Sequence, residues 1–283
     1  MAKQKKNGMP FFVGLNRIML SLGPLPDGRR CPYRCAFCYG DQGYSSYHSY
    51  SVPQIVEWVK ACDAHYDIVY VSGDTDSFAP PRTKIGIELL EALSDLDVDV
   101  LFTTRTIFDS RYLATLGGIA SKLRQSNHLL FGCISIPRLS SGKHLESANV
   151  PSPLERIAAL RALKEKGLHT VLTLRPFLPI IPTREYIEIV SMCQGFVDIV
   201  LGECWYVDEG GVIERRVFRG PTPPEITFIH QKMDFDNNQQ LWKVWEGREI
   251  EQSLRNYCGS SALPFFMRSR PAIELVRARN SAG

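Results

Sequence analysis

The sequence predicts an α/β fold, namely an incomplete (β/α)6 barrel that is TIM-like in architecture and carries a C-terminal extension. Short apolar runs rich in β-branched residues alternate with longer segments of helical periodicity. About six such units follow one another before this alternation stops. The 283-residue length and the hydrophobic content of 44% allow one large core. A doubly wound sheet has a similar pattern, and both arrangements gather ligands at the carboxyl ends of parallel strands.

The strands are the short apolar runs that lie between turn residues. The first run leads directly into a Gly/Pro-rich loop that carries three cysteines. The later runs each alternate with a helical segment, which is typical of parallel strands joined by crossover helices. We expect the six strands at residues 16–22, 67–72, 98–103, 129–135, 169–175 and 197–203.

The helices are the segments whose apolar residues recur every three or four positions, as Ile55, Val59 and Cys62 do. The helix after the fourth strand has the clearest boundary, because Ser152 is a suitable N-cap and Pro153 fits a first helical turn. We expect the helices at residues 52–64, 83–95, 109–123, 153–166 and 184–193.

The alternation stops after the sixth strand, which divides the chain into two parts. Residues 1–223 are expected to form the partial barrel with its N-terminal cysteine loop, and residues 224–283 the C-terminal extension. Residues 206–218 contain a Gly-Gly pair and are expected to form a hairpin. Trp242 and Trp245 are expected to pack the extension on the barrel, where it would close one side of the mouth and shape specificity.

The net charge, the N-terminal segment and the distribution of the cysteines indicate which partners and which compartment to expect. The 33 basic and 30 acidic residues give a net charge of +3, too small to indicate nucleic acid or a membrane surface. The basic residues at 3–6 and 277–279 are interpreted as solvated tails. Asn16 and Arg17 interrupt the apolar N-terminal stretch, and no run is long enough to span a bilayer. Because most of the eight cysteines are scattered singly, we expect a reducing cytoplasm rather than a secreted disulfide scaffold.

Three of the cysteines, Cys31, Cys35 and Cys38, lie within eight residues of one loop. Thiolates are the ligands of iron–sulfur clusters, and a cubane cluster has four ligand positions. Three cysteines therefore leave one iron open to a small molecule. A structural zinc site completed by His48 or Cys62 is the alternative.

The spacing C-x3-C-x2-C, with an aromatic residue directly before the last cysteine, resembles the signature of the radical S-adenosylmethionine superfamily. The resemblance implies a [4Fe-4S] cluster on Cys31, Cys35 and Cys38, with S-adenosylmethionine bound to the free iron. It also implies an enzyme that cleaves S-adenosylmethionine reductively to a 5′-deoxyadenosyl radical, which abstracts hydrogen from an organic substrate.

The resemblance also implies a set of cofactor-binding residues at strand ends and in the cysteine loop. Residues 72–74 stand where the superfamily has a glycine-rich motif, usually Gly-Gly-Glu, that binds the methionine amine. Ser135 is the candidate for binding the ribose hydroxyls, and Arg175 is the candidate for binding the methionine carboxylate. The aromatic residues of the cysteine loop are candidates for shielding the cluster and lining the adenine pocket. The candidates are Phe37, Tyr39, Ser72, Gly73, Asp74, Ser135 and Arg175.

A longer resemblance, over residues 28–200, is to the spore photoproduct lyase-related branch of the superfamily. It is carried by the segments 72–80, 100–106, 145–160 and 175–182. The lyases of this branch repair thymine photodimers in DNA with a cysteine hydrogen donor, for which Cys204 is the candidate here. They also have a basic surface for DNA, whereas this sequence concentrates no basic groove. Glu203 is the candidate for binding a polar substrate, while the cysteines expected to be core residues are Cys62, Cys133 and Cys193.

The partners follow from the same resemblance. An external electron donor such as flavodoxin or ferredoxin is implied, because no second cluster motif is present. The substrate would be a small molecule or a peptide, with nucleic acid as an alternative. A non-catalytic module that binds zinc or an iron–sulfur cluster is the competing class of function.

Overall fold

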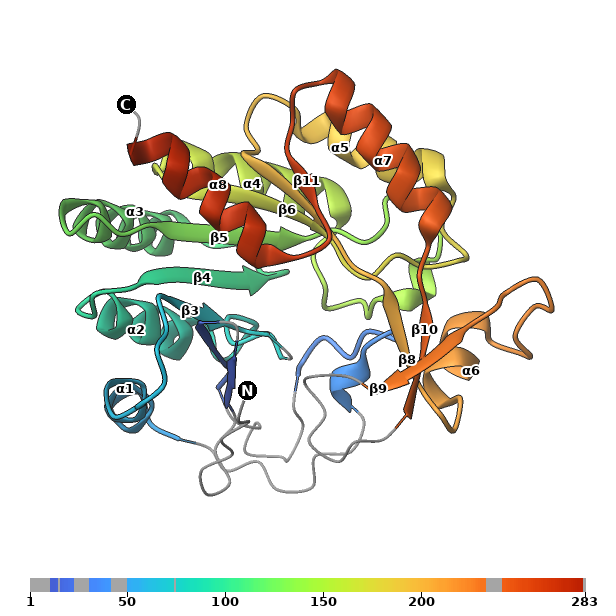
Figure 1. The fold of residues 1–283 in the computed structure, drawn as a ribbon, viewed down its shortest axis with the longest axis horizontal. Coiled ribbons are helices and arrows are strands. Elements are labelled where there is room, and N and C mark those ends of the chain that lie inside the picture. Colours follow the sequence, from blue (N-terminus) through green and yellow to red (C-terminus); the bar gives the residue numbers. More distant parts are fainter. Residues whose placement is uncertain are drawn as a thin grey trace.

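The main sheet curls into part of a barrel (Figure 1). The computed structural model describes residues 11–14, 16–22, 31–41, 50–73, 75–232 and 241–281. Asp74 and His48, named above as candidates, lie outside these ranges, as do residues 3–6. The sheet has the strand order β1-β2-β3-β4-β5-β6-β7-β11. Its strands are β1 (Phe11–Gly14), β2 (Arg17–Leu20), β3 (Ile68–Val71), β4 (Asp99–Thr104), β5 (Leu130–Ser135), β6 (His169–Leu174), β7 (Ile199–Gly202) and β11 (Phe265–Phe266).

Seven strands of this sheet run parallel, and only β1 pairs antiparallel with its neighbour β2. The six predicted strands correspond to β2 to β7. The register places Ser135 opposite Thr173 and Leu174 opposite Gly202, so the carboxyl ends of the strands meet at one edge. The predicted partial barrel is therefore confirmed, with β11 as an additional strand.

The crossover helices cover the outer face of the sheet. Ser152 is the N-cap of α4, as the sequence predicts. Its side chain accepts a hydrogen bond from the Glu155 backbone N–H at 3.3 Å. The first predicted helix ends at Lys60 rather than at residue 64. The helices are α1 (Val52–Lys60), α2 (Thr83–Leu93), α3 (Ser110–Gln125), α4 (Pro153–Glu165), α5 (Thr183–Cys193) and α7 (Arg248–Ser260), with 3-10 turns η1 (Tyr39–Asp41) and η2 (Lys143–Leu145).

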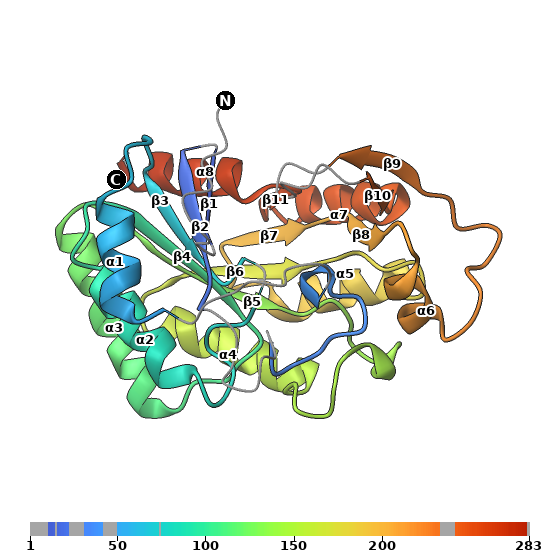
Figure 2. The same ribbon diagram turned by 90° about the horizontal axis from the view of Figure 1, so that it is seen from below.

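The concave face of the sheet is covered by the last helix, α8 (Ser269–Ser281). Its Ala272, Ile273 and Val276 pack in one cluster with inward-facing strand residues such as Leu101 and Phe131. Figure 2 shows α8 on the opposite side of the sheet from α2 and α4. Because side chains alternate along a strand, one set packs on the crossover helices and the other on α8.

The interpretation of residues 277–279 as a solvated tail was wrong for Arg277. Its guanidinium donates hydrogen bonds to the carboxylates of Asp67 and Asp99, at the opposite end of the barrel from the carboxyl strand ends. It also donates to the Asp67 carbonyl at 2.9 Å. These bonds fix α8 inside the barrel, which a local sequence pattern does not reveal.

The predicted hairpin over residues 206–218 was also wrong. Its first half is β8 (Trp205–Asp208), but its second half is the helix α6 (Val212–Phe218). The Asp208 carboxylate accepts hydrogen bonds from the N–H groups of Val212 and Ile213, at 2.9 and 2.8 Å, and so caps the helix. The Gly-Gly pair therefore precedes a helix instead of joining two strands.

The strand β8 pairs instead with residues from the C-terminal extension. A small sheet has the order β8-β10-β9, formed with β9 (Ile229–Lys232) and β10 (Leu241–Trp245). This sheet joins residues on the two sides of position 223. Within it, Trp242 is buried in the main core and Trp245 packs partly buried against it, as expected.

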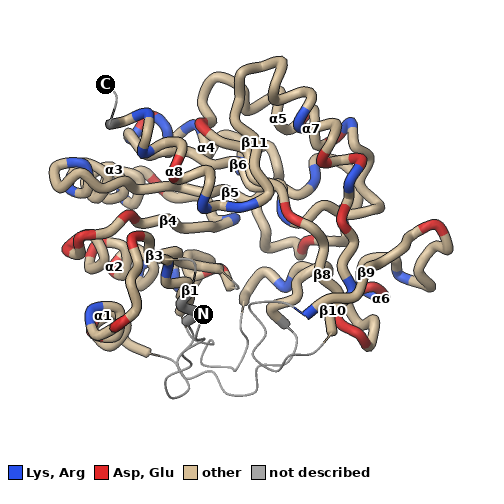
Figure 3. Tube along the Cα trace, viewed as in Figure 1, with Lys and Arg blue, Asp and Glu red and all other residues tan. Residues whose placement is uncertain are grey.

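Charges of both signs are interspersed along the described elements (Figure 3). None of the eight cysteines, all of which lie in described residues, forms a disulfide. Among the described residues, no helix is both long and apolar enough to cross a membrane.

Candidate functional site

A cavity lies at the carboxyl ends of the parallel strands, where the fold class predicts a ligand site. It is lined by the cysteine loop, by strand-end residues of β3 to β7, and by residues between β11 and α8. The candidate cluster, cofactor and substrate residues within the described ranges all line it: Cys31, Cys35, Phe37, Cys38, Tyr39, Ser72, Gly73, Ser135, Arg175, Glu203 and Cys204. The fold therefore brings together residues that are up to 173 positions apart in the sequence.

The cysteine loop is held over the cavity by hydrogen bonds to the strand-end loops. The Ala36 N–H donates to the Leu145 carbonyl at 2.8 Å. The hydroxyls of Tyr33 and Thr106 share a hydrogen bond of 2.8 Å. Within the loop, the Cys38 N–H donates to the Cys35 carbonyl at 3.1 Å, which folds the last cysteines into a tight turn.

Burial favours the protonated form of two thiols in this loop. It raises the pKa of Cys35 to about 12, and the nearby Arg105 guanidinium acts in the opposite direction. Burial also raises the pKa of Cys31, and the Asp76 carboxylate adds to this effect. The thiols of Cys31 and Cys35 are therefore neutral without a bound metal, and a cation must displace their protons.

Three thiols around one cavity fit a cluster held by three cysteines. The thiolates of such a cluster bind separate iron atoms, unlike the ligands of a single ion. In the described part of the chain, no three His, Cys, Asp or Glu side chains are gathered to hold one metal ion. Cys62, a proposed fourth zinc ligand, lies just beyond α1 and is not among the residues that line the cavity.

The loop after β3 forms one wall of the cavity and contacts the cysteine loop through Tyr39. Ser72 has a φ of 70°, and its hydroxyl accepts a hydrogen bond from the Ser77 N–H at 2.9 Å. The Gly73 carbonyl accepts a hydrogen bond from the Tyr39 hydroxyl at 3.3 Å. A Cβ at Gly73 would lie 2.8 Å from the Met19 methyl, so the end of the Met19 side chain packs directly on this glycine.

Asp76 fixes this loop to the neighbouring strand, a role that the sequence did not predict. Its buried carboxylate accepts hydrogen bonds from the Phe78 N–H at 3.0 Å and the Arg105 N–H at 2.8 Å. The Thr104 hydroxyl lies 2.9 Å from both carboxylate oxygens. The Asp76 carboxylate therefore lines the cavity but already accepts hydrogen bonds from groups of the protein.

A buried ion network supports the cysteine loop from behind. The Arg105 guanidinium lies 5.5 Å from the ring centroid of Phe37, a cation–π contact, and 3.2 Å from the Glu146 carboxylate. Arg156 binds the same carboxylate through two hydrogen bonds of 2.8 and 2.7 Å, and the Arg138 Nε lies 3.0 Å from it. The network thus connects the loop to α4. The sequence indicated none of these pairs.

The strands β5 and β6 supply the floor of the cavity. The buried Ser135 ends β5, where its carbonyl accepts a hydrogen bond from Arg156. Arg175 follows β6, and its Nε donates to the Gly202 carbonyl on β7 at 3.2 Å. This bond fixes the base of the guanidinium while the two terminal nitrogens have no hydrogen-bond partner among the described residues.

Glu203 and Cys204 follow β7 on the far side of the cavity. Cys204 is partly buried, and its sulfur lies 3.7 Å from the Glu246 carbonyl, to which the thiol donates. Burial raises the pKa of Cys204 to about 11, and the Glu203 carboxylate adds to this effect. The thiol therefore keeps its proton at neutral pH.

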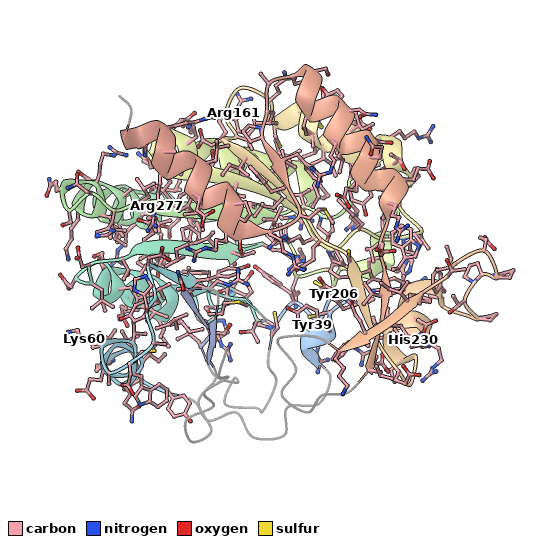
Figure 4. The ribbon with its side chains drawn as sticks, viewed as in Figure 1. Tyr39, Lys60, Arg161, Tyr206, His230 and Arg277 are labelled. Carbon is pink, nitrogen blue, oxygen red and sulfur yellow. The ribbon has the colours of Figure 1, made fainter. Side chains whose placement is uncertain are left out.

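Aromatic residues join the cysteine loop to the small sheet. The ring centroids of Tyr39 and Tyr206 are 6.0 Å apart in an edge-to-face contact, and those of Tyr39 and Trp242 are 6.3 Å apart. Figure 4 shows Tyr39 and Tyr206 beside each other. The small sheet thus covers the cavity next to Tyr39.

The C-terminal extension contributes directly to the cavity through Met267, Arg268 and Ser269. Arg17 on β2 donates to the Ser269 hydroxyl at the start of α8 at 2.9 Å, a contact between segments 252 residues apart in the sequence. Arg17 was noted in the sequence only as an interruption of an apolar run. A charged residue inside a parallel strand, which is normally apolar on both faces, was the signal that could have identified it.

Comparisons with known proteins agree with this fold. The model of the radical SAM superfamily matches residues 25–193, more than half of the chain. A search of curated proteins by sequence found no match.

Several solved structures share the fold at low sequence identity. A mutant of spore photoproduct lyase with bound AdoMet and dinucleoside spore photoproduct has a TM-score of 0.66 and 14% identity, over 89% of this chain and 76% of that one. Streptococcus suis SuiB bound to the precursor peptide SuiA has a TM-score of 0.61 and 14% identity, over 91% and 50%. The radical S-adenosylmethionine methyltransferase TsrM from Kitasatospora setae has a TM-score of 0.53 and 10% identity, over 86% and 51%. The family match over the cysteine loop and the four parallel strands β3 to β6 assigns the chain to the radical S-adenosylmethionine superfamily, whose members are enzymes that use a [4Fe-4S] cluster and S-adenosylmethionine.

Proposed function

We propose that this enzyme binds its cluster and S-adenosylmethionine in the cavity above the strand ends and abstracts hydrogen from an organic substrate held there. When bound, the reduced cluster and S-adenosylmethionine supply a 5′-deoxyadenosyl radical. The observation that carries the proposal is the meeting of three cysteine thiols with the polar strand ends in one cavity.

Cys31, Cys35 and Cys38 would hold the cluster. The contacts of Tyr33, Ala36 and Arg105 fix the loop before metal binds, so little ordering is needed. Arg105 interacts electrostatically with Cys35 and Cys38, and would therefore stabilise the negative charge of thiolates bound to iron.

The strand-end residues would hold S-adenosylmethionine. Ser72 and Gly73, with Asp74, would bind the methionine amine, and Ser135 would hydrogen-bond the ribose. Arg175 has its terminal nitrogens available for a carboxylate, since within the described part of the chain only its Nε donates a hydrogen bond. Phe37 and Tyr39 would exclude water from the cluster and line the adenine pocket.

Glu203 and Cys204 would face the substrate. The Glu203 carboxylate has no hydrogen bond or ion pair among the described residues, so it would accept a hydrogen bond from a polar substrate group. Because the enzyme needs a reductant, we further propose flavodoxin or ferredoxin as its electron donor and the cytoplasm as its compartment. A small molecule or a peptide is the proposed substrate.

Anaerobic reconstitution tests the proposal. The wild-type protein is loaded with iron and sulfide, reduced with dithionite and mixed with S-adenosylmethionine, and 5′-deoxyadenosine is quantified. Changing Cys31, Cys35 and Cys38 to Ala should abolish both cluster loading and 5′-deoxyadenosine. A matched Cys62→Ala variant should retain both, because Cys62 is not among the residues that line the cavity. Full loading of the triple variant would refute the ligand assignment, and a loaded wild-type protein that never cleaves S-adenosylmethionine would favour a non-catalytic module.

Lesion repair of the spore photoproduct lyase type is the second candidate, and Cys204 is the observation that favours it. Its thiol is protonated and lines the cavity, so it can transfer a hydrogen atom to a substrate radical. With a dinucleoside spore photoproduct as substrate, the wild-type protein should release thymine nucleosides, and Cys204→Ala should lose most of this product while it still cleaves S-adenosylmethionine. No turnover of this substrate by a protein that forms 5′-deoxyadenosine would exclude this candidate.

A further inference from the structure

Three arginines from distant parts of the chain meet in the cavity on the side of the C-terminal extension. Arg17 comes from β2, Arg175 follows β6, and Arg268 lies between β11 and α8. Arg17 interacts electrostatically with both of the others and with Glu203. We call Arg17, Arg175 and Arg268 the arginine cluster.

The arginine cluster has little compensating charge. Among the described residues, the acidic side chains that line the cavity are Asp76 and Glu203. Asp76 is already bound by the N–H groups and the hydroxyl of its own loop and of β4. Glu203 therefore faces three arginines alone, which leaves an excess of positive charge in the cavity.

The donors of the arginine cluster are largely unused. Arg17 gives one hydrogen bond, to Ser269, and its buried Nε has no partner among the described residues. Arg175 gives one hydrogen bond through its Nε. Arg268 has no hydrogen bond or ion pair within the described ranges and is exposed to the cavity mouth. Each guanidinium has five N–H donors, so most donors of the arginine cluster have no acceptor among the described residues.

The positive charges of the arginine cluster repel one another, and this repulsion affects Arg17. Burial lowers its pKa, and the positive charges of Arg175 and Arg268 lower it further, while Tyr70 and Glu203 act in the opposite direction. A bound anion would relieve this repulsion and satisfy the free donors at the same time.

The cofactor does not supply this anion. S-adenosylmethionine has one carboxylate but also an ammonium and a sulfonium group, so it adds net positive charge to the cavity. One arginine, Arg175 in the proposed arrangement, is sufficient for its carboxylate. Arg105 lies on the cysteine side, where it faces Cys35, Cys38 and Glu146. Arg17 and Arg268 therefore have no partner in the cofactor site.

We propose that the arginine cluster is the substrate-anchoring site and that it binds an oxyanion of the substrate, a carboxylate or a phosphate. This inference rests on the proposed function, because it places the substrate next to the cofactor site. Arg17 and Arg268 hold the oxyanion, and Glu203 accepts a hydrogen bond from a donor group elsewhere on the substrate. Arg17 lies on β2 and Arg268 lies between β11 and α8, so the bound oxyanion also links β2 to the C-terminal extension.

Calorimetric titration of the anaerobically reconstituted protein, saturated with S-adenosylmethionine, tests the inference. Inorganic phosphate and acetate are the probes, and they distinguish the two sources of the oxyanion. At least one should bind, and Arg17→Gln or Arg268→Gln should weaken its binding by about tenfold or more. Arg268 is exposed, so its substitution leaves the fold intact even if the change at Arg17 does not.

Two further variants make the test specific. Arg255→Gln removes an exposed arginine of α7 that is paired with Glu251, and should leave anion binding unchanged. Glu203→Gln should tighten anion binding, because it removes the opposing carboxylate. Failure of both probes to bind, or equal affinities in Arg268→Gln and Arg255→Gln, would overturn the inference. Formation of 5′-deoxyadenosine by the wild-type protein is measured in the same preparation, so failure of the proposed function is recognised separately.

Discussion

Replacing Glu146 by Gln should destabilise the protein strongly, although the two side chains have nearly the same shape. The Glu146 side chain is fully buried and faces Arg105, Arg138 and Arg156 at 2.7 to 3.2 Å. Removing one partner of a buried ion pair typically costs 3–5 kcal/mol, because the remaining charge stays buried and uncompensated. Since three arginines lose their counter-charge here, we expect a loss at the upper end, about 4–5 kcal/mol.

Urea unfolding of the metal-free protein, followed by tryptophan fluorescence, measures this loss. With an m value of about 3 kcal/mol/M, the midpoint should fall by roughly 1.5 M. Glu251→Gln is the matched control, since Glu251 pairs with Arg255 on the exposed face of α7. That pair should contribute about 0.5 kcal/mol or less.

A double-mutant cycle separates the ion pair from the shape of the site. Arg156→Met alone should also destabilise, because it leaves Glu146 with fewer cations, while the combination Glu146→Leu with Arg156→Met should recover part of the loss. If Glu146→Gln costs less than about 1 kcal/mol, the network contributes little, and the support it gives to the cysteine loop through Arg105 and Phe37 must come from packing alone.

Three more predictions concern stability elsewhere. Burial alone would raise the pKa of Glu185, but hydrogen bonds from Ser141 and from N–H groups of the loop after β5 lower it below its usual value. The stabilisation by Glu185 is therefore complete above its unfolded pKa of about 4.3 and is lost as the pH falls. The difference in unfolding free energy between wild type and Glu185→Gln should shrink between pH 7 and pH 3. A difference that stays constant over this range would contradict the prediction. Gly202→Ala would place a Cβ against the buried Phe177 ring, so thermal unfolding should show a loss of about 1–3 kcal/mol, and an unchanged midpoint would refute the contact. Arg277→Met should lower the free energy of unfolding in urea by about 2 kcal/mol, because two aspartates lose a charged donor. The control Arg279→Met, at an exposed position, should change it little. Equal effects of the two substitutions would show that α8 is not anchored by these bonds.

The barrel could be predicted from the sequence because its signals are local and repeated. Each βα unit carries its own apolar run and its own helical period, and the capping box at Ser152 marks a helix start within four residues. Topology then follows, since consecutive parallel strands are joined by right-handed crossovers. The candidate residues Ser135 and Arg175 were found in the same way, because strand ends of parallel sheets meet at one edge.

The rest could not be predicted, since it depends on contacts between distant segments. The strand β11 has two residues and no periodicity of its own, and forms only because β7 offers a free edge. Asp208 was interpreted as part of a hairpin, yet its carboxylate caps α6, and β8 pairs with a strand that comes more than 30 residues later. Asp76 and Glu146 are buried by contacts with distant segments, which no local pattern in the sequence indicates.

The position of α8 explains why these distant contacts matter for function. An open sheet of seven parallel strands would expose its concave face, and α8 covers the end of that face opposite the cysteine loop. The chain must then pass from β11 to α8 directly across the cavity, which brings Met267 and Arg268 into its lining. A segment that fills the barrel thereby also supplies part of the cavity wall, where we propose that the substrate binds. Changes to the packing of α8 should for this reason alter substrate binding before they alter the cysteine loop, which is held by separate contacts at Leu145 and Thr106.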